Sequence, residues 1–182
     1  SELEFNIETT SDDNYLKSHK IKSSITNNNS LLNSFLLMKG NKENFYMEAK
    51  VEAYEDLTKE KTSDKYQYLL PSFELSKSFN NNLTLVSNGY NKNYDTNIFE
   101  KVLINDLKYS SSPKIGSKGL VKKINILIKN VTTDGEKTNE YSNDFRSQNF
   151  GSILYDLSFP MKKVGSKYDS FLSGKASFMY SP

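Results

Sequence analysis

The stretch that decides the fold is SLLNSFLLMKGNKENFYMEAKVEAYEDL, residues 30–57. Its first part is apolar, its middle is a short polar segment at Gly40 and Asn41, and its second part alternates apolar with polar side chains. The alternating residues are Met47, Ala49, Val51 and Ala53 on one side and Glu48, Lys50 and Glu52 on the other. Alternation with period two is typical of a β-strand with one apolar and one polar face. Two such runs joined by a Gly-Asn turn predict a β-hairpin.

A helix is the alternative for the second half of this stretch. Met47, Val51, Tyr54 and Leu57 recur at helical spacing, and Glu, Ala and Lys are good helix formers. The preceding apolar run and turn favour the hairpin, so we interpret residues 44–54 as a strand.

Period-two patterns recur along the rest of the chain, for example at Ile124, Ile126 and Ile128. They predict nine strands, at 2–10, 30–39, 44–54, 67–79, 83–90, 96–110, 119–131, 149–161 and 169–180. Several of these approach the roughly 9–11 residues of a tilted membrane strand. Long connections tend to alternate with short ones, as in a meander that has tight turns at one end and long loops at the other. The predicted fold class is therefore all-β, an antiparallel meander forming part of a large outer-membrane β-barrel.

Residues typical of turns and loops give three further predictions. Asn80-Asn81-Asn82 predicts a tight turn, and the segment from Thr132 to Gly135 is expected to open the longest polar loop of the C-terminal half. Pro71 lies inside a predicted strand, which is expected to be irregular there because proline donates no ladder hydrogen bond. Connections 11–29, 55–66 and 132–148 are expected at one end of the sheet. Connections 40–43, 80–82, 111–118 and 162–168 are expected at the other.

Composition excludes several classes of protein. The chain has 182 residues, which suggests one domain, and a net charge of +2, which indicates no nucleic-acid partner. There is no cysteine, no apolar run long enough for a transmembrane helix, and no recognisable targeting segment at residues 1–20. Phe and Tyr make up 13% of the residues, which argues against disorder.

No catalytic, cofactor or metal site is predicted. His19 is the only histidine and is interpreted as a solvated loop residue, so neither a Ser-His-Asp triad nor a metal site with several histidines is expected. Asp12-Asp13-Asn14 lacks the spaced ligands of a calcium loop, and Gly116 and Gly119 lack phosphate-loop spacing. The acidic residues Glu43, Glu48, Glu52 and Glu55 are better explained by a wet strand face than by glycosidase chemistry. The protein is therefore not expected to be an enzyme.

Tyrosines recur near the predicted strand ends, at Tyr46, Tyr54, Tyr90, Tyr109, Tyr168 and Tyr180. They fit an aromatic girdle at a membrane interface, and they fit ordinary cross-strand packing equally well.

Four segments, in this order and spacing, resemble the barrel portion of the LPS-assembly family LptD, also called organic solvent tolerance protein. They are SDDNYLKSHKI, the hairpin of residues 30–57, DKYQYLLPSFELSKSF and FLSGKASFMYSP. The acidic turn is matched by Ser11, Asp12 and Asp13 with Tyr15 and Leu16, and the segment that heads the next strand is matched by Tyr66, Gln67 and Pro71. Each motif is short, so the order of the four is what supports the resemblance.

The resemblance implies an internal fragment. Residues 1–182 would form a partial transmembrane β-barrel domain of about nine strands, without the family's N-terminal periplasmic domain and remaining barrel strands. It implies delivery of lipopolysaccharide to the outer leaflet of the Gram-negative outer membrane. The implied partners are lipopolysaccharide, an LptE-like plug lipoprotein in the barrel lumen, outer-membrane lipid, and, through the periplasmic domain, an LPS-bridge protein.

In this interpretation the polar side chains Glu48, Lys50, Glu52, Lys123, Asn125 and Lys129 face the lumen and the opposite face contacts lipid. No gate residue matches. Two alternatives stay open: a porin-like outer-membrane channel, and a soluble all-β binding or adhesion domain whose apolar face packs on a second sheet.

Overall fold

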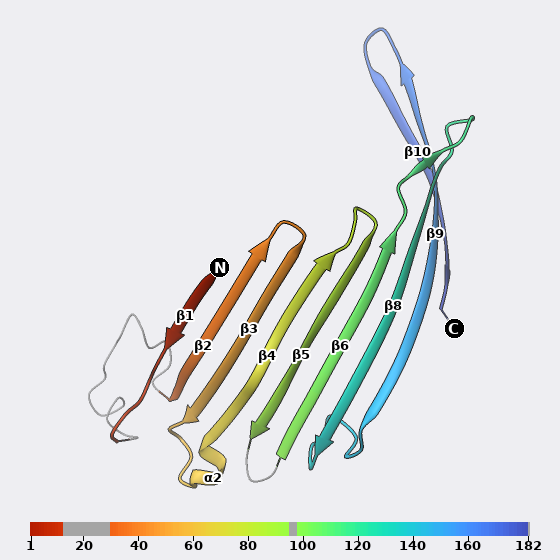
Figure 1. Ribbon diagram of the computed structural model, residues 1–182. Helices are drawn as coiled ribbons and strands as arrows, with labels where there is room; N and C mark the ends of the chain where they lie inside the picture. The colour runs from red at the N-terminus through yellow and green to blue at the C-terminus, as the bar shows by residue number, and fades with distance from the viewer. Residues whose placement is uncertain (13–29, 95–97, 182) are drawn as a thin grey trace. The chain divides into compact units, whose positions relative to one another are not determined.

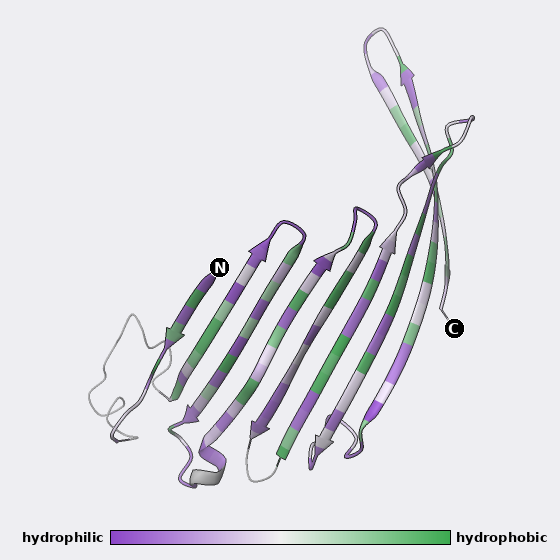
Figure 2. Cartoon of the chain, in the orientation of Figure 1, coloured by the Kyte–Doolittle hydropathy of each residue, from purple (hydrophilic) through white to green (hydrophobic). Residues whose placement is uncertain are grey.

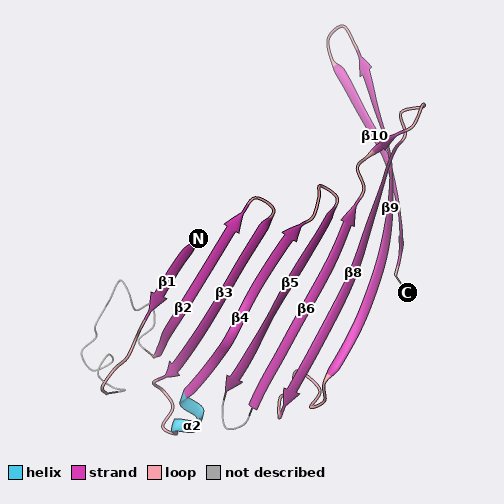
Figure 3. Ribbon diagram, viewed as in Figure 1, coloured by secondary structure: helices cyan, strands magenta, loops and turns pink. Residues whose placement is uncertain are grey.

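The computed structural model describes residues 1–12, 30–94 and 98–181, and in these residues nearly all regular structure is antiparallel β-sheet (Figure 3). Ten strands form one sheet in the order β1-β2-β3-β4-β5-β6-β8-β9-β10, with β7 paired to β8 (Figure 1). The strands are β1 (Glu2–Asn6), β2 (Leu31–Lys42), β3 (Phe45–Asp56), β4 (Tyr66–Ser78), β5 (Leu83–Tyr94), β6 (Ile98–Ser110), β7 (Lys114–Ile115), β8 (Val121–Glu136), β9 (Arg146–Val164) and β10 (Asp169–Tyr180). A four-residue helix, α2 (Thr62–Lys65), precedes β4. The all-β antiparallel meander expected from the sequence is confirmed.

All nine predicted strands are present; β10 has the predicted bounds, and the other eight differ at one or both ends. Two elements were not predicted: α2, which lies in the predicted connection 55–66, and β7, which lies in the predicted connection 111–118. Most of the connection 11–29 lies outside the described residues, together with Asp13, Asn14, Tyr15, Leu16 and His19.

The hairpin of residues 30–57 is the pair β2–β3, which rules out the helical alternative. The register runs from Leu31 opposite Asp56 to Lys42 opposite Phe45. The predicted Gly-Asn turn is wrong, because Gly40 lies inside β2, opposite Met47. The turn residues are Glu43 and Asn44, and Glu43 has a φ of 42°. A two-residue hairpin turn needs positive φ to match the twist of its strands, and here a glutamate adopts it.

β8 and β9 are longer than predicted. Thr132 to Gly135 belong to β8 and do not open the loop, which begins at residue 137. β9 likewise begins at Arg146. The hydroxyl groups of Thr132 and Ser147 lie 3.2 Å apart, so polar side chains contact each other across β8 and β9 beyond the predicted ends of the two strands. In contrast, β1 ends at Asn6, four residues before its predicted end.

The predicted turn at Asn80-Asn81-Asn82 is confirmed. The Asn80 side-chain oxygen accepts hydrogen bonds from the backbone N–H groups of Asn82 and Leu83, both at 2.8 Å, as in an Asx-turn. Gly119, at φ +80°, donates its N–H to the Gly116 carbonyl in the loop between β7 and β8. β4 is continuous through Pro71, and the Leu70–Pro71 peptide bond is cis.

The chain packs as two compact units. The first comprises residues 1–76, 87–104 and 131–147, and the second comprises residues 77–86, 105–130 and 148–182. Among the described residues, the buried apolar side chains are Leu32, Leu37, Leu57 and Val102, all in the first unit. Most other large apolar side chains are exposed or half-buried, because the described residues form no second layer that covers the sheet. In the described residues no helix has the length and apolar character needed to cross a membrane.

Candidate functional site

In the first unit, charged side chains of β1 and β2 meet on one face of the sheet. Glu2 pairs with Lys39 and Glu4 pairs with Leu37 in the strand register, so alternate residues of the two strands share a face. The Lys39 ammonium lies 3.8 Å from the Glu2 carboxylate and 3.7 Å from the Glu4 carboxylate. We call this the polar face of the first unit.

On β3 the polar face is continued by the predicted residues Glu48, Lys50 and Glu52. The Lys50 ammonium lies 2.6 Å from the Glu52 carboxylate and 4.6 Å from the centroid of the Phe35 ring on β2. Lys50 is therefore both an ion-pair and a cation–π partner, which lets a charge sit over an apolar ring. The register places Phe35 opposite Glu52, which confirms that the three side chains lie on one face.

Two tyrosines cap the carboxylates on this face. Tyr46 donates a 2.7 Å hydrogen bond to Glu48, and Tyr54 donates a 2.8 Å hydrogen bond to Glu52. Of the two interpretations of these tyrosines, contact between side chains within the sheet is therefore favoured, because a girdle would need their rings on the apolar face. Their hydroxyl groups satisfy acceptors on the polar face instead.

Glu100 on β6 is the most deeply buried side chain among the described residues, with an exposed fraction of 1%. One carboxylate oxygen accepts hydrogen bonds from Thr138 at 2.6 Å and from Tyr94 at 2.8 Å. Thr138 belongs to the loop 137–145, and in the same loop the Tyr141 hydroxyl lies 3.4 Å from that of Tyr90. These contacts hold the loop against polar side chains of β5 and β6. The Tyr90 hydroxyl therefore contacts the loop, as in packing between side chains of the same protein.

In the second unit a row of polar side chains crosses four strands. Ser110 on β6 donates to Asn125 on β8 at 2.8 Å, and Asn125 donates to Asp156 on β9 at 2.9 Å. Ser177 on β10 donates to the other oxygen of Asp156 at 2.7 Å. We call these four residues the polar row. Asn125 lies on the predicted polar side of its strand and joins β6 to β9.

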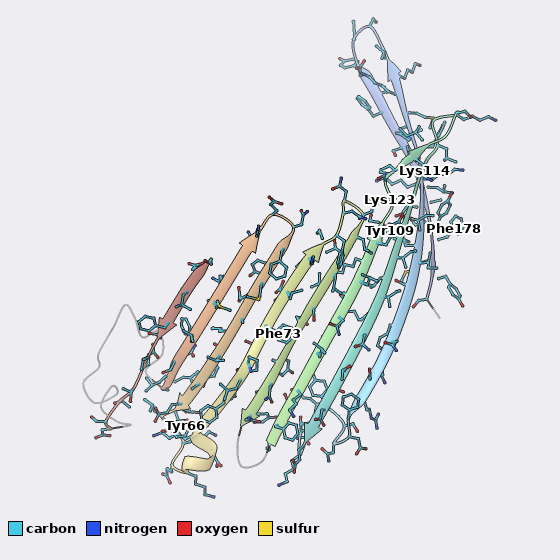
Figure 4. The ribbon with its side chains drawn as sticks, in the orientation of Figure 1. Tyr66, Phe73, Tyr109, Lys114, Lys123 and Phe178 are labelled. Carbon is cyan, nitrogen blue, oxygen red and sulfur yellow. The ribbon has the colours of Figure 1, made fainter. Side chains whose placement is uncertain are left out.

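Charges flank the polar row. The Lys129 ammonium lies 2.8 Å from the Asp106 carboxylate, and Lys108 lies 3.7 Å from the same carboxylate. Lys123 is two positions from Asn125 and therefore shares its face; it is labelled in Figure 4. The three predicted residues of β8 thus share one face, the polar face of the second unit.

A hollow of about 380 Å³ adjoins the polar row. Its walls include Asn125 and Ser110 from the row and the apolar side chains Leu127, Leu154 and Met179. Leu154 and Met179 are direct partners in the β9–β10 register. The polar face of the second unit therefore has an apolar patch next to its hydrogen-bonded row, a combination that suits contact with an amphiphile or with a protein surface.

The opposite face of the second unit is apolar and exposed. The register sets Ile153 opposite Tyr180, Tyr155 opposite Phe178, and Leu157 opposite Ala176. Phe178, labelled in Figure 4, has an exposed fraction of 63%. Figure 2 shows the resulting alternation of hydrophilic and hydrophobic residues along the strands. The same holds in the first unit, where Leu3 and Phe5 are exposed beside Met38 and Leu36.

Sequence reasoning found the strand faces and missed the two carboxylates that organise them. For Asp156 the alternating pattern predicts only a polar residue on one face of a strand, and not its hydrogen bonds to two neighbouring strands. Glu100 gave no signal at all, because its partner Thr138 lies 38 residues away, in a loop whose position no periodicity predicts. In the described part of the chain no group of three or more acidic or histidine side chains could hold a metal ion.

Comparison with known families gives one match. Residues 2–100 match the family model of LptD, described as LPS transport system D. No curated protein and no solved structure matches the chain. The matched segment begins in β1 and ends in β6, and it covers more than half of the 182 residues. The chain therefore belongs to the LptD family of lipopolysaccharide transport proteins.

Proposed function

We propose that this chain is a segment of an outer-membrane β-barrel that assembles lipopolysaccharide in the outer leaflet. The observation that carries the proposal is the two-sided character of the sheet. In each unit one face is charged and hydrogen-bonded, and the other exposes apolar side chains with no protein layer over them. Spanning strands with this pattern place the apolar side in lipid and the polar side in the lumen.

Residues 1–182 would then be a partial transmembrane barrel domain, and chain outside these residues would supply the remaining strands and a periplasmic domain. β1 and β10 support this, because each has one neighbour among the strands of the described residues. An unpaired edge in lipid leaves backbone N–H and C=O groups unsatisfied, at a cost of several kcal/mol per group. Further strands of the barrel would pair with both edges.

The polar faces would line the route of the lipopolysaccharide headgroup and contact a plug lipoprotein of the LptE kind. The LPS-bridge protein would bind through the periplasmic domain. The chain supplies lysines for anionic groups on this route, of which Lys129 and Lys108 flank one carboxylate. No residue has a catalytic role in this proposal.

The proposal is tested by depleting the full-length protein from cells and following newly labelled lipopolysaccharide to the cell surface. We expect arrival at the surface to stop. A photocrosslinking amino acid at Lys123, on the polar face, is expected to capture lipopolysaccharide during transport. Undiminished arrival after depletion would contradict the transport role. Loss of small-solute permeation with normal lipopolysaccharide arrival would identify a porin-like channel instead.

A further inference from the structure

One face of β8 changes character within a few residues. Ile124, Ile126 and Ile128 occupy alternate positions of this face, and the next three alternate positions are Asn130, Thr132 and Asp134. The isoleucines belong to the exposed apolar side of the second unit. The face therefore turns from apolar to polar between Ile128 and Asn130.

The change occurs at the same level on β9, whereas the same face of β6 keeps Leu103 and Phe99 beyond Asn105. The Asn105 amide on β6 donates to Asn130 at 3.4 Å, and the Asn130 amide donates to Asn149 on β9 at 2.8 Å. We call these three residues the asparagine row. On β9, apolar residues of this face begin at Ile153, four positions beyond Asn149.

Beyond the row two pairs of polar side chains meet on this face. Thr132 and Ser147 have their hydroxyl groups 3.2 Å apart, and the Lys101 ammonium lies 3.9 Å from the Asp134 carboxylate. An ion pair and two hydroxyls facing hydrocarbon would each be costly. The same groups carry no such cost when they face water or lipid headgroups.

Strand length points the same way. A tilted strand needs about 9–11 residues to cross the hydrocarbon core. β8 has 16 residues and β9 has 19, so each is longer than a crossing requires. At about 3.4 Å per residue, the six steps from Asn130 to Glu136 correspond to about 20 Å of strand. The excess length of β8 coincides with its polar segment.

We infer that the asparagine row lies at the membrane–water interface, toward the C-terminal end of β8, and that its amides contact lipid headgroups. The inference rests on the proposed membrane location of the sheet and adds where the lipid ends. Amide-to-amide hydrogen bonds satisfy the three side chains where water becomes scarce. The ends of β8 and β9 beyond the row stand outside the bilayer as a paired extension.

The test uses the full-length protein in phosphatidylcholine vesicles, with a bimane fluorophore on single cysteines. Ile128→Cys and Thr132→Cys are a matched pair, four residues apart on one face of β8. Ile153→Cys and Ser147→Cys form a second pair on β9, in case one variant does not assemble. Quenchers are lipids that carry a nitroxide in the middle of the acyl chain or on the headgroup, and aqueous iodide.

We expect the acyl-chain quencher to act at least threefold more strongly on labels at 128 and 153 than on labels at 132 and 147. Headgroup nitroxide and iodide should show the reverse order. Equal acyl-chain quenching at both members of each pair would overturn the inference while leaving the sheet in the membrane. Absence of lipid quenching at all four positions would overturn the proposed membrane location itself.

Discussion

The Asn125 amide on β8 donates a 2.9 Å hydrogen bond to the Asp156 carboxylate on β9. The second oxygen of Asp156 accepts the Ser177 hydroxyl of β10 at 2.7 Å. One carboxylate thus ties three adjacent strands on the polar face of the second unit. Both bonds are partly exposed to solvent. They fix the register of the three strands, which apolar contacts on the opposite face do not specify.

Replacing Asp156 with alanine should weaken the sheet, because Asn125 and Ser177 both lose their acceptor. Hydrogen bonds to a charged group contribute about 1.5–3 kcal/mol when buried, and we expect about 1–2 kcal/mol here because water replaces part of the loss. The measurement is thermal unfolding of the full-length protein in detergent by circular dichroism. Ser158→Ala, on the same face of β9, is the control and should unfold as the parent does. An Asp156→Ala protein as stable as the control would contradict the structural role of the polar row.

Phe178 and Ser177 are adjacent on β10 and point to opposite faces, so lysine at each position tests the two faces separately. Phe178→Lys should lower the yield of assembled protein, since a lysine in lipid costs about 2–4 kcal/mol near the midplane. Ser177→Lys should assemble nearly normally, because the register places position 177 opposite Asp156. Assembly is measured as the folded fraction in outer-membrane extracts. Equal harm from both substitutions would argue against a lipid-facing and a water-facing side.

Gly89 on β5 has no room for a side chain. A Cβ there would lie 2.5 Å from the Val102 carbonyl oxygen and 3.1 Å from the Phe73 ring. Gly89→Val is expected to displace β6 or Phe73 and to destabilise the sheet by about 1–3 kcal/mol, as overpacking does elsewhere. Gly40→Val is the matched control on β2, because a Cβ at Gly40 meets nothing within 4 Å. Unfolding in urea should separate the two variants, and a Gly89→Val protein that unfolds with its control would show that the close approach is unimportant.

Thr138 fastens the loop 137–145 to the buried Glu100 carboxylate. Thr138→Val keeps the shape of the side chain and removes both the 2.6 Å hydrogen bond to Glu100 and the 3.2 Å bond that the hydroxyl accepts from the Glu140 N–H. The loss should raise the rate of amide hydrogen exchange in the loop severalfold. Glu100→Gln retains an acceptor and should have a smaller effect. Ser142→Ala, in the same loop, controls for general sensitivity. Unchanged exchange in Thr138→Val would mean that the Tyr90–Tyr141 contact alone holds the loop.

The strand faces could be predicted from the sequence because alternation is a local property. Lys50 and Val51 fall on opposite faces of any extended strand, whatever its partner. Strand ends were less accessible, because pairing decides them. Thr132 and Asp134 have little strand signal of their own, but their partners Ser147 and Lys101 extend the sheet through them. The sequence predicts a turn at Gly40, but Gly40 is paired with Met47 in the strand register and the turn lies at Glu43.

The buried site at Glu100 could not be predicted for a different reason. A carboxylate on a strand is usually solvated, and only the position of Thr138 and Tyr94 makes burial of this one tolerable. That position depends on how the loop 137–145 folds back, which no pattern in its polar sequence specifies. Of the carboxylates singled out from the sequence, Glu52 is ion-paired with Lys50, so sequence proximity was sufficient there.

The central claim, that the apolar side of the sheet faces lipid and the polar side faces an aqueous lumen, is tested most directly at two positions of β8. Ile126→Cys and Lys123→Cys in the full-length membrane-embedded protein would each carry a nitroxide. We predict that the label at 126 is more accessible to oxygen than to a polar nickel reagent, and that the label at 123 shows the opposite preference. A label at 126 that neither reagent reaches would indicate a protein core against a second sheet, and would contradict the account.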